Sequence, residues 1–232
     1  MDIGFSTGTL KNTHLSIPER IRVFSEVGAT AVEIALRTRE ELIELKVDSA
    51  LKKAVEGFSF VSVHAPWINI RYNEYNLGVI KKLQQIGVRI PVKAFVLHPD
   101  IIDDFGLLAG IPVAIENMDP RKQFGTKPEE LEKLIVAHRV KIVLDLHHAY
   151  LHDPSMQIAQ RIAHTAKENL SHIHVSGAAG HSHTPLRNAP NQEIIIRTLK
   201  KYDLPIILEF TADEHYMTTL AEEYHHLSNL FK

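Results

Sequence analysis

Short apolar runs recur along the chain, and six of them end on a histidine or a carboxylate. They are FVSVHAP, AFVLHPD, VAIENMD, KIVLDLHHA, SHIHVSG and PIILEF. Apolar runs of this length, bounded by polar and turn-forming residues, are typical of buried strands in a parallel sheet. We therefore predict a set of strands whose carboxyl ends carry His64, His98, Glu116, Asp145, His174 and Glu209.

Helix-like segments separate these strands almost without exception. We predict eight strands, at residues 2–6, 32–36, 60–64, 94–98, 113–117, 141–145, 171–175 and 206–210. The predicted helices begin near residue 16 and continue at residues 38–55, 77–86, 101–109, 129–138, 155–168, 191–201 and 214–230. Eight strand–helix units in 232 residues favour one α/β domain over residues 1–232, a single (β/α)8 TIM barrel. A doubly wound open sheet is the alternative, but no G-x-G-x-x-G motif follows the first strand.

The residues two positions before the strand ends support a closed barrel. Side chains alternate along a strand, so these residues share the inward direction of the strand-end residues. They are mostly small or apolar: Ser62, Val96, Ala114, Val143, His172 and Ile207. The polar strand ends would then form a layer at the carboxyl end of the barrel, where such enzymes carry their catalytic groups.

This layer is predicted to bind metal ions. A single strand-end histidine is more often a hydrogen-bonded structural group, but six coincident positions change that interpretation. Glu116, Asp145 and Glu209 would repel one another at a water-poor face unless cations neutralised them. The chain has no cysteine, so the ligands are nitrogen and oxygen, which suit Zn²⁺ or Mn²⁺.

Four further histidines follow the sixth and seventh predicted strands. In D-L-H-H, His147 keeps the inward direction of Asp145, whereas His148 begins the loop. In H-S-H, His181 and His183 face the same side if the segment is extended, which suits two ligands of one ion. We predict that His147, like His172, orients ligands without binding an ion.

Composition limits the possible partners. The formal net charge is −2, from 26 basic and 28 acidic residues, so no global basic field attracts nucleic acid, although bound divalent ions could supply positive charge. The N-terminus lacks a basic stretch followed by an apolar region, and no run of 18 apolar residues occurs. We expect a soluble cytoplasmic protein with no membrane segment and no obligate protein partner. Trp67, which could equally be a loop anchor, and Arg187 are candidate substrate-binding residues.

The ordered motifs resemble those of endonuclease IV, a family of the xylose isomerase-like barrels that cuts DNA at abasic sites with three zinc ions. The motifs are H-A-P-W-I-N (64–69), L-H-P (97–99), I-E-N (115–117), D-L-H-H-A (145–149), I-H-V (173–175), H-S-H (181–183) and I-L-E (207–209). The resemblance implies a first ion on His64, His98 and Glu116. It implies a second ion on Asp145, His174 and Glu209, with Glu116 bridging the first and second ions. It also implies a third ion on His148, His181 and His183. His181 stands where that family has aspartate, and the connection at residues 99–112 is short.

Three functional hypotheses follow. The first is a metal-dependent phosphoester hydrolase acting on abasic DNA or a related phosphodiester, with Glu116, Asp145 and Glu209 as catalytic residues and two or three ions. Three divalent ions on ligands with three carboxylates would leave a charge of about +3, which attracts phosphate. The second is a single-metal sugar or sugar-phosphate isomerase or epimerase, in which Glu116 and Glu209 exchange a proton with the substrate. Such enzymes share the Glu, Asp, His, Glu quartet but generally lack His64 and His98. The third is a metal-bearing barrel that binds a ligand without catalysis.

Overall fold

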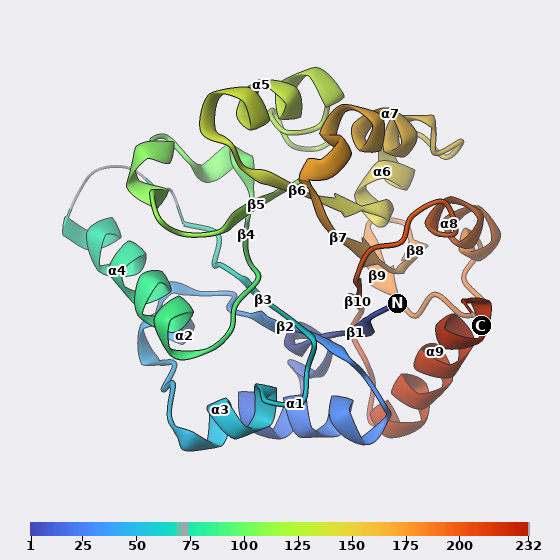
Figure 1. The fold of residues 1–232 in the computed structure, drawn as a ribbon. Coiled ribbons are helices and arrows are strands. Elements are labelled where there is room, and N and C mark those ends of the chain that lie inside the picture. The colour runs from blue at the N-terminus through green and yellow to red at the C-terminus, as the bar shows by residue number, and fades with distance from the viewer. Residues whose placement is uncertain (69, 71–73, 232) are drawn as a thin grey trace.

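The strands of the computed structural model, which describes residues 1–68, 70 and 74–231, close into a parallel barrel (Figure 1). Neighbouring strands follow the order β1-β10-β7-β6-β5-β4-β3-β2. Their bounds are Ile3–Ser6 (β1), Ala31–Ala35 (β2), Phe60–His64 (β3), Ala94–Leu97 (β4), Val113–Glu116 (β5), Lys141–Asp145 (β6), Leu170–Val175 (β7) and Ile206–Leu208 (β10). The predicted (β/α)8 TIM barrel is therefore confirmed. Asn69, the last residue of H-A-P-W-I-N, lies outside the described residues.

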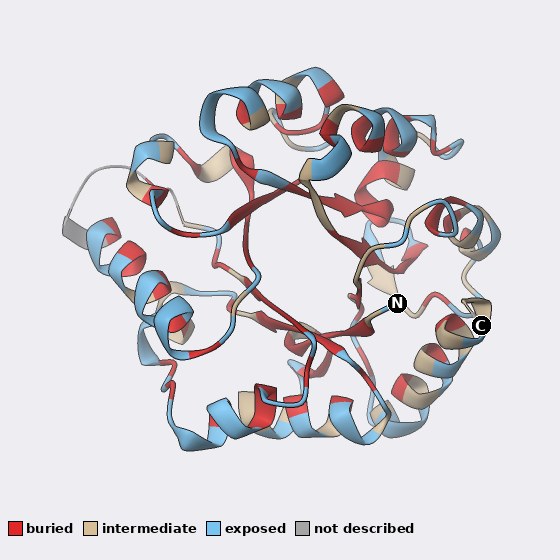
Figure 2. Cartoon of the chain, viewed as in Figure 1, coloured by how far each residue is buried: buried red, intermediate tan, exposed pale blue. Residues whose placement is uncertain are grey.

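Helices surround the barrel, with buried inner faces and exposed outer faces (Figure 2). They are Ile17–Glu26 (α1), Arg39–Glu44 (α2), Ser49–Val55 (α3), Glu74–Arg89 (α4), Pro128–His138 (α5), Leu146–His152 (α6), Gln157–Ala166 (α7), Gln192–Leu199 (α8) and Tyr216–Leu230 (α9). Short 3₁₀ helices lie at Thr7–Leu10 (η1), Pro99–Ile101 (η2), Phe105–Leu108 (η3) and Lys167–Asn169 (η4). Within the described part of the chain, none of the helices combines the length and apolar character that a membrane span requires.

Three connections differ from the prediction. The helix expected at residues 38–55 is interrupted between α2 and α3, where the Asp48 side chain accepts the Leu51 N–H at 3.0 Å and starts a new helix. The helix expected at residues 101–109 is replaced by η2 and η3, because Pro99 and the Asp104 cap each start a separate short turn. After β7, an unpredicted antiparallel hairpin pairs Gly177–Ala179 (β8) with Ser182–Thr184 (β9).

The segment after β6 is a helix rather than a loop. Asp145 ends β6 and caps α6, because its Oδ1 accepts the His148 N–H at 2.7 Å. The prediction that His147 keeps the inward direction of the strand is therefore wrong. His147 and His148 lie in the first helical turn, where successive side chains point about 100° apart.

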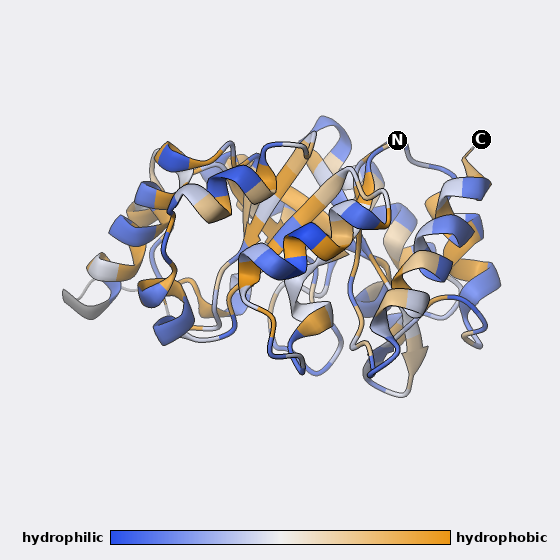
Figure 3. Cartoon of the chain, turned by 90° about the horizontal axis from the view of Figure 1, so that it is seen from below, coloured by the Kyte–Doolittle hydropathy of each residue, from blue (hydrophilic) through white to orange (hydrophobic). Residues whose placement is uncertain are grey.

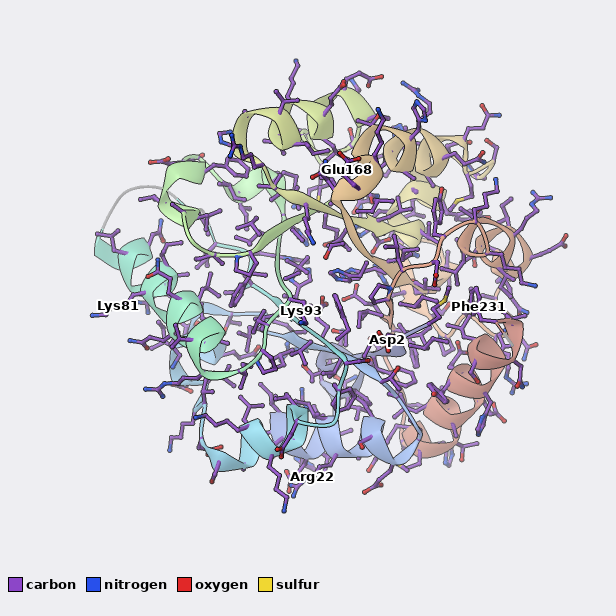
Figure 4. The ribbon with its side chains drawn as sticks, in the orientation of Figure 1. Asp2, Arg22, Lys81, Lys93, Glu168 and Phe231 are labelled. Carbon is purple, nitrogen blue, oxygen red and sulfur yellow. The ribbon has the colours of Figure 1, made fainter. Side chains whose placement is uncertain are left out.

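The barrel interior is layered as the alternation of side chains predicts. All six predicted inward residues are buried. Val96, Ala114 and Val143 belong to one apolar cluster with Ala94, and Ile207 packs with Ala31 and Phe60 in another. Seen from the side, hydrophobic strands cross the middle of the molecule (Figure 3). Asp2, Lys93 and Glu168 precede strands and mark the amino end of the barrel (Figure 4), so the strand-end residues lie at the opposite end.

Candidate metal centre

Glu116, the last residue of β5, lies at the centre of the strand-end cluster. Its Oε2 lies 2.9 Å from His98 Nε2 and 3.2 Å from His64 Nε2. Its Oε1 lies 3.4 Å from His174 Nδ1 and 3.5 Å from His148 Nδ1. Each carboxylate oxygen therefore faces a different pair of imidazoles, an arrangement suited to a carboxylate that bridges two ions.

Two groups of potential ligands share Glu116. One is His64, His98 and Glu116, and the other is Glu116, Asp145, His174 and Glu209; within each group the ligand atoms lie within 4.8 Å of one another. His174 Nδ1 lies 3.4 Å from Glu209 Oε2 and 4.0 Å from Asp145 Oδ2. The structure thus brings the predicted residues together in the predicted sets. Their donor atoms and spacing fit divalent ions, although the occupation of these sites stays a prediction.

Hydrogen bonds to the backbone orient two of the histidines. His64 Nδ1 lies 3.0 Å from the Ala65 carbonyl oxygen, and His148 Nδ1 lies 2.9 Å from that of Asn117. A carbonyl can only accept, so each Nδ1 carries a proton and each Nε2 is the nitrogen left for an ion. A second ring nitrogen fixed in this way is typical of histidine metal ligands. His64 approaches Glu116 through Nε2, at 3.2 Å, whereas His148 approaches it through the proton-bearing Nδ1, at 3.5 Å.

Asn117 holds the ends of β5 and β6 together. Its side-chain Nδ2 donates to the Asp145 carbonyl oxygen at 3.0 Å, and its Oδ1 accepts the Asp145 N–H at 2.8 Å. This side chain thereby continues the strand pairing beyond the last backbone hydrogen bonds. The carboxylates of Glu116 and Asp145 are consequently set at a fixed separation, which a preorganised metal site requires.

Without an ion, protons must offset the buried negative charge. Burial alone would lower the pKa of His64, but the hydrogen bond and charge of Glu116 raise it to about 9. Burial also opposes protonation of His174, yet Glu209, Glu33 and Glu116 raise its pKa well above the usual value. Burial raises the pKa of Glu209 to about 8 and that of Asp145 to about 6. The ion-free site therefore holds protons at neutral pH that an ion must displace.

Other histidines of the region remain neutral. Burial lowers the pKa of His98, and burial together with the charge of neighbouring histidines lowers that of His183 to about 3 and that of His147 to about 4. A neutral imidazole has a free lone pair, which is the form that binds metal. His98 Nε2 already accepts the Trp67 indole N–H at 3.3 Å. An ion at this nitrogen would have to break that hydrogen bond.

The three histidines of the predicted third site are less closely assembled. His181 is exposed in the turn between β8 and β9, so H-S-H is not extended throughout and the condition for both histidines to face one side is not met. His183 Nδ1 lies 3.2 Å from Ser176 Oγ, and its ring stacks on His147 with centroids 4.0 Å apart. Across the residues that the structure describes, His148, His181 and His183 form no group with ligand atoms within 4.8 Å. The third ion remains a prediction.

Glu33 is a site residue that the sequence analysis missed. It lies in the middle of β2, is fully buried, and forms a further group of potential ligands with His172 and His174. The available signal was a single carboxylate inside the otherwise apolar strand A-V-E-I-A. His172, predicted to orient ligands, does contact His174, with the two Nε2 atoms 3.1 Å apart.

A cavity of about 850 Å³ opens beside the potential metal ligands. Besides His64, His98, Glu116 and other site residues, its lining includes four basic side chains: Lys11, Arg37, Arg121 and Lys122. Trp67 lines it as well and is 67% exposed. Among the described residues that line this cavity, Arg187 does not appear, and its guanidinium pairs instead with Glu222 of α9. This placement gives the predicted substrate-binding role of Arg187 no support.

The fold and this cluster define a (β/α)8 barrel with potential metal ligands at the carboxyl ends of its strands. Residues 101–230 match the family model described as "Xylose isomerase-like TIM barrel", so the chain belongs to that family. A search of curated proteins finds no match.

Solved structures share the whole fold at low sequence identity. A D-tagatose 3-epimerase-like protein is 18% identical with a TM-score of 0.75, and the match covers 100% of this chain and 97% of that chain. An AP endonuclease, family 2, from Brucella melitensis is 16% identical with a TM-score of 0.72, covering 97% and 99%. A D-allulose 3-epimerase from Methylomonas sp. is 12% identical with a TM-score of 0.71, covering 99% and 98%. At these identities the comparisons establish the fold and leave the reaction open.

Proposed function

We propose that the protein is a metal-dependent phosphoester hydrolase in which Glu116 bridges two divalent ions. The observation that carries the proposal is that Glu116 belongs to both groups of potential ligands: its Oε2 lies 2.9 and 3.2 Å from the Nε2 atoms of His98 and His64, and its Oε1 lies 3.4 Å from Nδ1 of His174. Two divalent ions at such a site lower the pKa of a nearby water and stabilise charge on the attacking and leaving oxygens of phosphate.

The surrounding residues contribute in different ways. His64 and His98 complete a second ligand set that a single-ion isomerase does not need. Glu209 is the ligand carboxylate with the greater access to the cavity, because its side chain is 19% exposed whereas that of Asp145 is 1% exposed. We propose that Glu209 accepts the proton that an attacking water loses. Asp145 then serves to orient the other ligands.

The basic side chains at the mouth of the cavity favour a small anionic substrate over a long nucleic acid. Three of the four basic lining side chains are already paired with carboxylates: Arg37 with Glu41, Arg121 with Asp119 and Lys122 with Asp100, at 2.7–2.8 Å. A protein that follows a nucleic-acid backbone uses many unpaired cations. Bound ions would therefore supply most of the attraction for phosphate, and a small phosphodiester is as suitable a substrate as abasic DNA.

Ion counting and hydrolysis test this proposal. Elemental analysis of protein purified without added metal should find at least two Zn²⁺ or Mn²⁺ ions per chain, and a single ion would contradict the bridged site. The loaded protein should hydrolyse bis(4-nitrophenyl) phosphate or a duplex with one abasic site. Glu116→Gln should reduce the rate about a hundredfold or more, because the ions supply several kcal/mol of charge stabilisation. Glu129→Gln, on the exposed surface of α5, is the matched control.

A single-ion sugar or sugar-phosphate epimerase or isomerase is the second candidate. The observation that favours it is the placement of two carboxylates around His174. Glu116 Oε1 and Glu209 Oε2 each lie 3.4 Å from His174 Nδ1, so the two could share one ion with it. Such a pair provides one acid and one base for proton exchange beside a carbonyl. Deuterium uptake from D₂O into a ketose, with one ion per chain and no phosphodiester hydrolysis, would support this candidate instead.

A further inference from the structure

Glu33 is a carboxylate enclosed inside the barrel beneath the metal-binding residues. Its side chain has no solvent exposure. Ser62 Oγ donates to its Oε2 at 2.9 Å, and the Nε2 atoms of His174 and His172 lie 3.2 and 3.5 Å from the same oxygen. The other oxygen, Oε1, has no hydrogen-bond partner within the described part of the chain. An isolated carboxylate would be costly in this environment, so its retention indicates a specific partner.

His174 is that partner, because its two ring nitrogens face different carboxylates. Nε2 faces Glu33, whereas Nδ1 lies 3.4 Å from both Glu116 Oε1 and Glu209 Oε2. The imidazole therefore connects the enclosed Glu33 with the open metal-binding layer. Only one of its nitrogens can bind an ion while the other still carries a proton.

His172 provides a second acceptor for His174. Its Nδ1 lies 3.0 Å from Ser171 Oγ, and its Nε2 lies 3.1 Å from His174 Nε2. When Nδ1 of His172 carries the proton and donates to Ser171, its Nε2 presents a lone pair to His174. The N–H on His174 Nε2 thus has two acceptors, Glu33 Oε2 and His172 Nε2.

We propose that Glu33 is a positioning residue that accepts the Nε2–H of His174 and directs the Nδ1 lone pair of His174 toward the ion shared with Glu116, Asp145 and Glu209. The hydrogen bond fixes the tautomer and the ring orientation of the ligand. A carboxylate in this role also makes the imidazole a stronger donor to the metal. The inference rests on ion binding at this site, which the proposed function requires, but not on the identity of the substrate.

The same three side chains offer a competing arrangement. The ligand atoms of Glu33, His172 and His174 lie within 4.8 Å of one another and could themselves hold an ion. His174 would then have to bind one ion through each nitrogen, which requires loss of its second proton. An ion at Nδ1 together with a proton at Nε2 avoids that cost, so we favour the hydrogen-bonded arrangement.

Zn²⁺ affinity and stoichiometry test the proposal on the full chain. Glu33→Gln keeps the size of the side chain but removes its charge, and Glu33→Ala also removes the acceptor. We expect the affinity at the His174 site to fall about 10-fold or more in Glu33→Gln and up to about 100-fold in Glu33→Ala, with the number of ions unchanged. Val96→Ala, in the apolar cluster of the barrel interior, is the packing control and should leave the affinity within about 3-fold. If Glu33→Ala fails to fold, Glu33→Gln alone decides the result.

Nitrogen-15 NMR of the Zn²⁺-loaded protein reports the tautomer directly. We expect His174 to show a protonated Nε2 and a metal-bound Nδ1 in the wild type. Unchanged affinity in both Glu33 variants, with ions bound to the wild type, would overturn the positioning role alone. The loss of one whole ion in Glu33→Gln, or metal at His174 Nε2, would identify Glu33 as a ligand and also overturn it. A wild type that binds no ion would overturn this inference together with the proposed hydrolase.

Discussion

Zn²⁺ binding to the ion-free protein should release protons, and the structure sets their number. In the absence of an ion, the pKa of His64 is raised to about 9, that of Glu209 to about 8 and that of Asp145 to about 6, while that of His174 lies well above its usual value. Zn²⁺ requires these groups as neutral imidazoles and ionised carboxylates. Filling both ligand sets must therefore displace the protons that they hold.

The expected release at pH 7 is about three protons per chain. Each of His64 and His174 holds about one proton, Glu209 holds about nine-tenths of one, and Asp145 holds about a tenth, given their pKa values. His98 contributes none, because burial lowers its pKa and leaves it neutral. The apparent affinity should accordingly rise about tenfold per pH unit for each proton displaced.

Isothermal titration calorimetry in buffers of different ionisation enthalpy measures this number. A plot of observed enthalpy against buffer enthalpy has a slope equal to the protons released. His64→Asn should lower the slope by about one proton, because it removes one of the protonated groups. A wild-type slope below about one at pH 7 would refute the reasoning, since it would mean that the buried carboxylates are not balanced by bound protons.

Three further predictions concern stability and the cavity. The pKa of His64 is raised on folding from 6.5 to about 9, so its stabilisation of the ion-free protein is complete below pH 6.5 and is lost as the pH rises through 9. In urea unfolding, the wild type should therefore lose about 3 kcal/mol more over this range than His64→Asn, and equal losses would contradict the prediction. Glu223→Leu should lower the free energy of unfolding by about 2–4 kcal/mol in the same assay, because the Glu223 carboxylate accepts the Leu186 and Arg187 N–H groups. A loss below about 1 kcal/mol would show that these donors find other partners. Trp67→Phe removes the N–H that occupies His98 Nε2 and should raise Zn²⁺ affinity about 2- to 10-fold in chelator competition, whereas weaker binding would show that the indole supports the site.

Strand-end residues were predictable because one local rule governs them. Side chains alternate along each strand, and parallel strands end at the same face, so Glu116, Asp145 and His174 could be brought together from sequence alone. No knowledge of loops or distances was needed. The same rule also predicted the buried layer beneath them, including Val143.

The rest of the site depends on contacts that cannot be predicted from the alternation of side chains along a strand. Glu33 lies inside a strand rather than at its end, and its partner His174 is 141 residues away, so the role of Glu33 becomes visible only when β2 and β7 face each other across the barrel. The directions of His148 and His181 depend on local hydrogen bonds. Asp145 caps α6 by accepting the His148 N–H, and the His148 ring then bonds the Asn117 carbonyl oxygen. His181 is exposed because it lies in the β8–β9 turn.

When the charge of Glu33 is included, the number of divalent ions that neutralises the buried carboxylates changes. The strand-end ligands carry three carboxylates, and two divalent ions on them leave an excess of about one positive charge. Glu33 contacts the ligand His174 directly and adds a fourth carboxylate, so two divalent ions balance the negative charge when the histidines are neutral.

A third ion near His148 and His183 would restore an excess of about two positive charges, with no further carboxylate in that predicted set to offset it. We therefore expect the first two ions to resist a chelator and any third ion to dissociate first. The third ion would then act mainly when an anionic substrate supplies the missing negative charge.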